Sequence, residues 1–176
     1  MHGQIEVPSA IALVAVMGTA AVADLRTRRI PNSLIVVGLA AALLPRLWAG
    51  LPELGLGVAG AGVGLLVGLG CFALGAMAGG DGKLLMVAGA FFGPVQVLGA
   101  FLAIAVAGGV LAIVAAIAGG TILPAVLSTG RLLQYYLSFG RAGEARALGS
   151  TGAQRVPYAV AIAVGSVVWR FWGGQL

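Results

Sequence analysis

The sequence predicts an all-α membrane protein, a polytopic bundle of about six transmembrane helices. Of its 176 residues, 60% are hydrophobic and only 9% are charged, and the mean hydropathy is +1.08. A soluble domain is closer to half apolar and a quarter charged, so the bilayer must solvate the excess apolar surface. Most of the thirty glycines lie within the apolar runs, where small residues let membrane helices approach closely. No repeat or linker divides the chain, and residues 1–176 are expected to form one transmembrane domain.

Each predicted helix corresponds to an apolar run, and a span needs about 20 residues. The stretch 84–122 has 39 residues without a charge, which is too long for one span and suits two. The segment at about 121–156 is more polar and is expected to form a loop on the inner face. In order, the runs cover residues 7–23, 33–48, 54–78, the two halves of 84–122, and 157–172.

The distribution of basic residues predicts the orientation, because Lys and Arg concentrate in cytoplasmic loops. With six spans and both termini outside, only Arg46 and Arg170 fall in outer segments. A single span over 84–122 would export four arginines, which again favours two. The inner loops hold Arg26, Arg28, Arg29, Lys83, Arg131, Arg141, Arg146 and Arg155.

The net charge of +5 is therefore assigned to orientation and to contact with anionic lipid headgroups. No nucleic-acid binding is expected, because no basic stripe interleaves with aromatic residues. Residues 21–23 are small, like a signal-peptide cleavage site, but the arginines follow this run instead of preceding it. The first run is therefore expected to remain as a span.

The counts of cysteine and histidine exclude several kinds of site. Cys71 is the only cysteine, so the sequence predicts neither an internal disulfide nor a cysteine metal cluster. His2 is the only histidine, which makes an H-E-x-x-H zinc site impossible and a buried Ser-His pair hard to build. No metal and no cofactor are expected.

Two of the five acidic residues stand where an apolar run meets the inner surface. Asp24 ends the first run, and Asp81 follows the third among glycines, so both should reach the same membrane face. Acids at the hydrocarbon edge are costly and indicate function unless a structural role explains them. The structural alternatives are that Asp24 pairs with Arg28 or Arg29, and that Asp81 is a solvated turn residue.

A close pair of carboxyl groups has a specific chemistry. The two acids cannot both ionise, so they share one proton. The ionised group can take a proton from water while the protonated one polarises a carbonyl, and amide hydrolysis then needs no metal, serine or histidine. The pair Asp24 and Asp81 therefore predicts an aspartic-type endopeptidase.

Three motifs resemble those of one peptidase family. Residues 24–32, Asp-Leu-Arg-Thr-Arg-Arg-Ile-Pro-Asn, resemble the first-aspartate motif of the type IV prepilin peptidases. Residues 80–85, Gly-Asp-Gly-Lys-Leu-Leu, resemble their second motif, G-x-G-D, with Ala78 at its first position. Residues 155–163 resemble the start of their last span. The motifs come in the expected order, and the chain is most similar to the short, membrane-only members that serve Flp/Tad-type pili.

This resemblance implies a substrate and a place of action. The substrate would be a prepilin with a short basic leader, a glycine before the cut and an apolar helix after it. Cleavage would occur at the cytoplasmic face of the bacterial inner membrane, in type IV pilus biogenesis and protein secretion. Besides the two aspartates, supporting or substrate-binding roles fall on the motif residues Gly79, Gly80, Lys83, Pro31 and Asn32.

Two other functions remain open from the sequence. A proton-coupled transporter or channel component could use the same two aspartates, and it would place them near the bilayer midplane in broken helices. A Ser-Lys peptidase could use Lys83 with Ser33, although a lone lysine is more often an anchor at the inner face.

Overall fold

The computed structural model describes residues 3–74, 77–120 and 158–173, with side chains from residue 8 onward. The chain divides into two compact units, Met1–Gly108 with Pro157–Leu176, and Gly109–Val156. All residues discussed below as a site lie in the first unit. The expected inner-face loop at about 121–156 lies outside the described residues.

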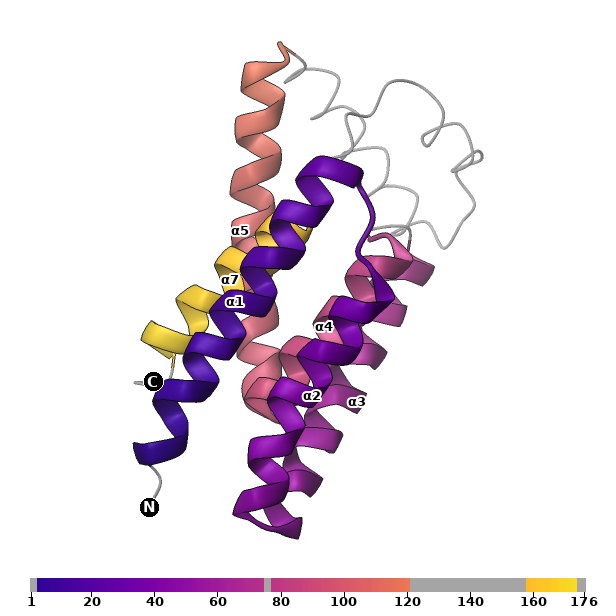
Figure 1. Ribbon diagram of the computed structural model, residues 1–176. Coiled ribbons are helices and arrows are strands. Elements are labelled where there is room, and N and C mark those ends of the chain that lie inside the picture. The colour runs from indigo at the N-terminus through magenta and orange to yellow at the C-terminus, as the bar shows by residue number, and fades with distance from the viewer. Residues whose placement is uncertain (1–2, 75–76, 121–157, 174–176) are drawn as a thin grey trace. The chain divides into compact units, whose positions relative to one another are not determined.

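The described residues are helical apart from short connections, which confirms the all-α prediction (Figure 1). Residues 84–122, predicted to hold two helices, are indeed divided by a break after Phe92. The helices are α1 (Gly3–Thr27), α2 (Asn32–Ala49), α3 (Leu51–Ala73), α4 (Gly79–Phe92), α5 (Gln96–Ala118) and α7 (Tyr158–Trp172).

Four of these helices, α1, α2, α3 and α5, are long and apolar enough to cross a membrane. The other two are apolar but shorter, with 14 residues in α4 and 15 in α7. At 1.5 Å per residue, α4 covers only about 21 Å, against roughly 30 Å of hydrocarbon. One of its ends must therefore lie below a membrane surface.

Short breaks between the helices follow from backbone geometry. Gly50 and Gly93 have φ of 128° and 84°, which side-chain-bearing residues rarely adopt. At the end of α1, Arg28 has φ of 52°, an unusual value for a residue with a side chain. Pro31 then precedes α2 in an extended conformation, and its carbonyl accepts the first hydrogen bonds of that helix. These breaks make α1 to α4 run alternately up and down (Figure 1).

Glycine brings α3 and α4 into backbone contact. A Cβ added at Gly60 would collide with the backbone of Gly89 and Gly93, and one added at Gly68 would lie 2.6 Å from the Cα of Gly82. The four glycines that α3 buries, Gly57, Gly60, Gly64 and Gly68, recur every three or four residues. They therefore form one face of that helix. Such small-residue faces are typical of closely packed membrane helices.

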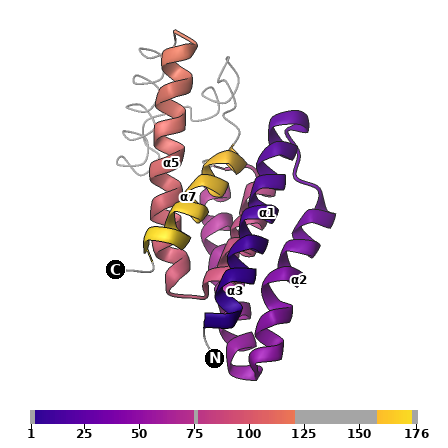
Figure 2. The same ribbon diagram turned by 60° about the vertical axis from the view of Figure 1, so that its left-hand side comes forward.

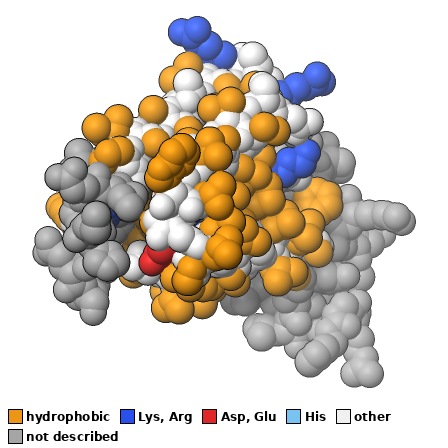
Figure 3. All heavy atoms as spheres, turned by 60° about the horizontal axis from the view of Figure 1, so that its bottom comes forward, with side chains coloured by type: hydrophobic (Ala, Val, Ile, Leu, Met, Phe, Trp, Pro, Cys, Tyr) orange, Lys and Arg blue, Asp and Glu red, His pale blue; other side chains and the backbone are white. Residues whose placement is uncertain are grey.

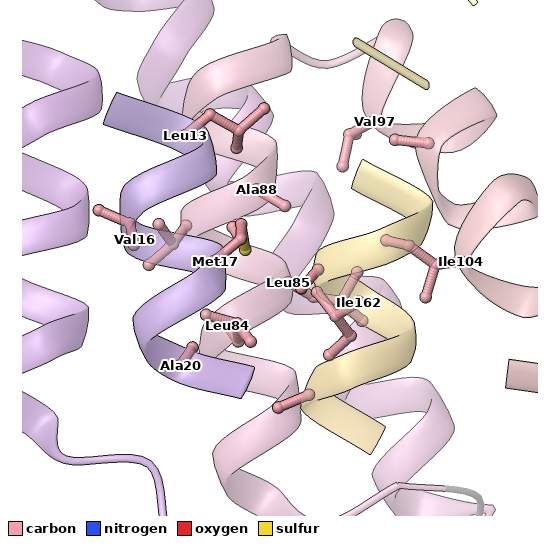
Figure 4. Packing of buried hydrophobic residues seen from close by; sticks show 14 of the residues in the cluster. Leu13, Val16, Met17, Ala20, Leu84, Leu85, Ala88, Val97, Ile104 and Ile162 are labelled. Atoms are coloured by element: carbon pink, nitrogen blue, oxygen red, sulfur yellow. The ribbon is translucent and has the colours of Figure 1, made fainter. Parts of the chain in front are cut away.

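The core of this unit brings α1, α4 and α7 together. Figure 4 shows Met17 of α1 near Leu84 and Leu85 of α4, with Ile162 of α7 beside them and Leu13 one turn further along α1. All five are at most 1% exposed. Helix α7 packs along α1 and meets α5 at Gly165, where an added Cβ would clash with the backbone of Ile104 (Figure 2). The last helix in sequence thus packs beside the first.

The outward faces of the long helices are apolar. Ile11, Val36, Leu66 and Leu102 are each 65–69% exposed. Figure 3 shows hydrophobic side chains covering much of one end of the molecule, with basic side chains at the edge of that view. A soluble monomer rarely exposes so much contiguous apolar surface. Lipid is the solvent that fits these faces.

Candidate active site

Asp24 lies in the last turn of α1 and is partly buried. Its carboxylate Oδ2 accepts a hydrogen bond from the backbone N–H of Ala159, at 3.3 Å. Ala159 is the second residue of α7 and lies 135 positions away in the sequence. The first N–H groups of a helix have no partner within it, and they stabilise negative charge. The start of α7 therefore orients the Asp24 carboxylate.

The structure does not support the alternative in which Asp24 pairs with a neighbouring arginine. Arg28 and Arg29 are exposed. Among the described residues, the ion pair found is that between Arg46 and Glu53, at the opposite ends of the helices. The side-chain contact of Asp24 is instead with the backbone of α7.

Asp81 lies in the first turn of α4 and is only 7% exposed. Its carboxylate Oδ2 accepts a hydrogen bond from the N–H of Ala78, at 3.2 Å, and so caps its own helix. The alternative of a solvated turn residue is therefore wrong. Helix α4 begins at Gly79, two residues before the aspartate, and its start packs against α3. Ala78, which stands where the family motif has glycine, contributes through its backbone.

The electrostatics of Asp81 reflect this burial. Asp81 lies outside the four helices that are long enough to cross a membrane. Burial raises the pKa of its carboxyl group to about 6, the hydrogen bond from Ala78 acts in the opposite direction, and the nearby charge of Asp24 raises the pKa further. The Asp24 charge therefore lies within electrostatic range of the Asp81 carboxyl group. A buried acid with a raised pKa can hold a proton when its partner is ionised.

Of the five residues expected to support the site, some contact one another near the start of α4 and others do not. Lys83 Nζ donates a hydrogen bond to Asn32 Oδ1 at 3.0 Å, which ties the first turn of α4 to the first residue of α2. Pro31 precedes this residue and shapes the start of α2. Gly80 faces Ile30, whose Cβ lies 3.8 Å from where a Cβ at Gly80 would be. Gly79 is exposed at the start of α4.

The Ser-Lys alternative gains nothing from this arrangement. The hydrogen bond of the Lys83 amine is directed to Asn32, and Ser33 is exposed. Within the described part of the chain, no group of three or more His, Cys, Asp or Glu side chains could hold a metal ion.

Sequence reasoning missed two residues that the structure places in contact with these elements. The N–H of Ala159 holds Asp24, but a backbone donor leaves no trace in residue type. The available signal was the position of Ala159 just after Pro157, at the start of an apolar run. Arg46 was assigned to an outer segment, yet its guanidinium reaches the carbonyl of Phe91 at the end of α4. Only its place among apolar residues could have indicated a structural role.

A comparison with protein families decides the affiliation. The model of the type IV leader peptidase family (Peptidase_A24) matches residues 11–113, which is more than half of the chain. The chain belongs to the type IV leader peptidase family. It is thus a peptidase, and its apolar helices make it a membrane protein. No curated protein and no solved structure was found to match the chain significantly.

The matched region contains the elements that carry the candidate site of this type IV leader peptidase. Asp24 on α1 and Asp81 on α4 both fall within residues 11–113, as do Asn32 and Lys83. Helix α7, which supplies the Ala159 N–H, follows the matched region. The resemblance inferred from three short motifs is thereby confirmed at the level of the family.

Proposed function

We propose that this leader peptidase is an aspartic-type endopeptidase in which Asp24 and Asp81 form the catalytic pair. The observation that carries the proposal is the placement of both carboxyl groups at one end of the helices, close enough for the charge of Asp24 to act on Asp81. They come from elements 57 positions apart in sequence, yet each is held by a backbone N–H. A purely structural pair of acids would gain nothing from such proximity.

The two environments favour different roles. The carboxyl group of Asp81 is buried, which favours its protonated form, and its proton can polarise the scissile carbonyl. The carboxylate of Asp24 faces the N-terminus of α7 and can take a proton from the attacking water. As the tetrahedral intermediate collapses and its C–N bond breaks, Asp24 passes the proton it took from water to the leaving amine, and Asp81 keeps its own proton.

For the substrate, we propose a Flp-type prepilin that carries a short basic leader. The end of the helices that holds both aspartates also carries the exposed basic residues Arg26, Arg28 and Arg29. Arg46 and Arg170 lie in the last turns of α2 and α7, at the other end. This asymmetry favours a cytoplasmic site in the inner membrane, with both termini outside. A basic leader would stay on the cytoplasmic side for the same reason.

The transporter alternative finds no support in the helix geometry. It calls for acids near the middle of the bilayer, in interrupted helices. Asp24 instead lies in the last turn of α1, and Asp81 in the first turn of α4.

The proposal is tested by coexpressing the chain with a Flp-type prepilin and scoring leader removal. Asp24→Asn and Asp81→Asn should each abolish cleavage, because an amide can neither accept the proton from water nor share one. Glu6→Gln, which also neutralises an acid on α1 but more than four turns away from Asp24, should cleave like the wild type. Membrane insertion of each variant is checked by its amount in the membrane fraction. Leader removal by either Asn variant at the wild-type rate would refute the proposed pair.

A further inference from the structure

Arg46 makes an unusual set of contacts for a residue near the end of a membrane helix. Its Nη2 donates to the backbone carbonyl of Phe91 at 2.8 Å, and its Nη1 lies 3.3 Å from Glu53 Oε2. The side chain of Arg46 is only 20% exposed. Its stem lies over Gly57 of α3, where an added Cβ would be 2.6 Å from Arg46 Cδ. One guanidinium thus joins the end of α2 to the start of α3 and the end of α4.

The contact with Phe91 pairs a backbone carbonyl at the end of α4, a helix that is shorter than its neighbours. The last four carbonyl groups of a helix have no partner within it, and Phe91 is the penultimate residue of α4. Because α4 is too short to cross the hydrocarbon, these carbonyl groups cannot all reach water at the far side. An unsatisfied carbonyl in such surroundings is costly. The charged donor of Arg46 satisfies it and also favours the negative end of the helix.

Arg46 is also one of three points that hold α4 against α2. At the other end, Lys83 Nζ binds Asn32 Oδ1 at 3.0 Å. Between these ties, Gly38 receives Val87, whose Cγ1 lies 2.8 Å from where a Cβ would be. Asn32, Gly38 and Arg46 follow one another along α2 as their partners do along α4. The two helices therefore lie parallel in one fixed register.

The face of α4 that meets α3 packs backbone against backbone. Its contact with α3 is made by glycines and backbone atoms, such as Gly60 with Gly89 and Gly68 with Gly82. The axial position of α4 is therefore set by its side-chain packing against α1, α2 and α7 together with the polar ties at its two ends. Asp81 lies in the first turn of the same helix, so any shift of α4 moves its carboxyl group relative to Asp24.

We propose that Arg46 is a positioning residue for the peptidase reaction: it clamps the far end of α4 to α2 and α3 and thereby sets the place of Asp81. This inference rests on the proposed catalytic pair for its effect on cleavage. The clamp itself is independent of that function. Arg46 touches neither carboxyl group, and it acts only through the helix that carries one of them.

The clamp can be measured without an activity assay. The Cβ of Ile30 and the Cβ position at Gly80 are 3.8 Å apart, a separation typical of disulfides. A protein with Ile30→Cys, Gly80→Cys and Cys71→Ser should form this cross-link readily on mild oxidation. The rate of formation reports the place of the first turn of α4 relative to the start of α2. Adding Arg46→Gln should slow it several-fold.

Cleavage of a Flp-type prepilin by the purified full-length chain provides the second arm. Arg46→Gln, in a protein with its native Ile30 and Gly80, should lower kcat about tenfold or more with KM nearly unchanged, since small misplacements of catalytic groups cost up to roughly 100-fold. Arg46→Lys should be intermediate, because an ammonium keeps the charge but lacks the planar fork that bridges two acceptors. A loss of folding would instead reduce the amount of folded protein without this graded order.

A second pair of variants tests the position of the Arg46 side chain by substitutions on α3. Gly57→Ala should crowd the stem of Arg46 and mimic part of the loss, whereas Gly55→Ala, with nothing within 4 Å, should behave like the wild type. An unchanged cross-linking rate in Arg46→Gln would overturn the inference, whether or not cleavage falls. A slower cross-link with unchanged kcat would equally overturn it. If the wild type cleaves no prepilin but the cross-link responds to Arg46, the proposed function fails and the clamp stands.

Discussion

The glycine contact between α3 and α4 allows a matched test of how tightly these helices must pack. Gly64 is buried against α4, and a Cβ there would lie 3.0 Å from the carbonyl carbon of Leu85, 3.3 Å from the Cα of Met86 and closer still to the Leu85 oxygen. None of these is a side-chain atom that could rotate away. Gly62, half a turn along the same helix, is exposed and has nothing within 4 Å. Gly64→Ala and Gly62→Ala therefore add the same methyl group in opposite surroundings.

The expected magnitude follows from this comparison. Both substitutions gain about 1 kcal/mol of helix propensity, which cancels between them. Overpacking a filled interface costs about 1–3 kcal/mol, and only Gly64→Ala incurs that cost. For a chain of this length, 1 kcal/mol corresponds to roughly 2–4 °C in Tm. Gly64→Ala should thus unfold at a temperature lower by about 2–12 °C than Gly62→Ala.

The assay is thermal unfolding of both purified variants in one detergent, followed by circular dichroism at a fixed heating rate. Prepilin cleavage is measured on the same samples below the transition. Because Asp81 is carried by α4, Gly64→Ala should also cleave more slowly than Gly62→Ala. Equal transition temperatures, or a higher one for Gly64→Ala, would show that the helices do not meet through their backbones as described.

Three further outcomes are expected. Cleavage should decline as the pH rises through about 6, because burial raises the pKa of Asp81 to about that value and the proton proposed to polarise the carbonyl is lost above it. A plateau of kcat/KM that extends well above this pH would contradict the proposed role. Ala159→Pro removes the N–H that is donated to Asp24 and should slow cleavage about tenfold. Val160→Pro is the control, because proline is tolerated in the same first turn of α7, and it should have a much smaller effect. In intact cells without the native cysteine, an impermeant thiol reagent should label a cysteine at Leu51 and spare one at Arg29, and the reverse pattern would invert the orientation.

Much of the fold follows from patterns that act locally. Apolar runs and their breaks predicted the helices, and Gly93-Pro94 divides the long run because glycine takes the positive φ there. The sequence also placed Asp24 and Asp81 at one end. It misjudged the start of α4, however, since an aspartate among glycines has the composition of a turn. Burial against α3 stabilises a helix from Gly79 despite that composition.

The rest depended on contacts between distant segments. The hydrogen bond from Ala159 to Asp24 joins backbone to side chain across most of the chain, and no residue type encodes it. Arg46 and Phe91 meet because two helices of unequal length begin side by side and end at different depths. Charge counting assigns Arg46 to orientation alone, because it takes no account of unpaired carbonyl groups. Such pairings arise from tertiary packing, which a single sequence does not display.

The hydrogen bond between Asp24 and Ala159 also orders events during synthesis. Asp24 belongs to α1, which emerges from the ribosome before α7, the helix of Ala159, and α1 packs closely along α7. Until α7 has inserted, the carboxylate lacks its backbone donor and α1 lacks one of the helices that it packs against. A nascent or prematurely ended chain would therefore hold both aspartates without the donor that orients one of them. The proposed catalytic pair therefore reaches its described arrangement only after α7 has packed against α1.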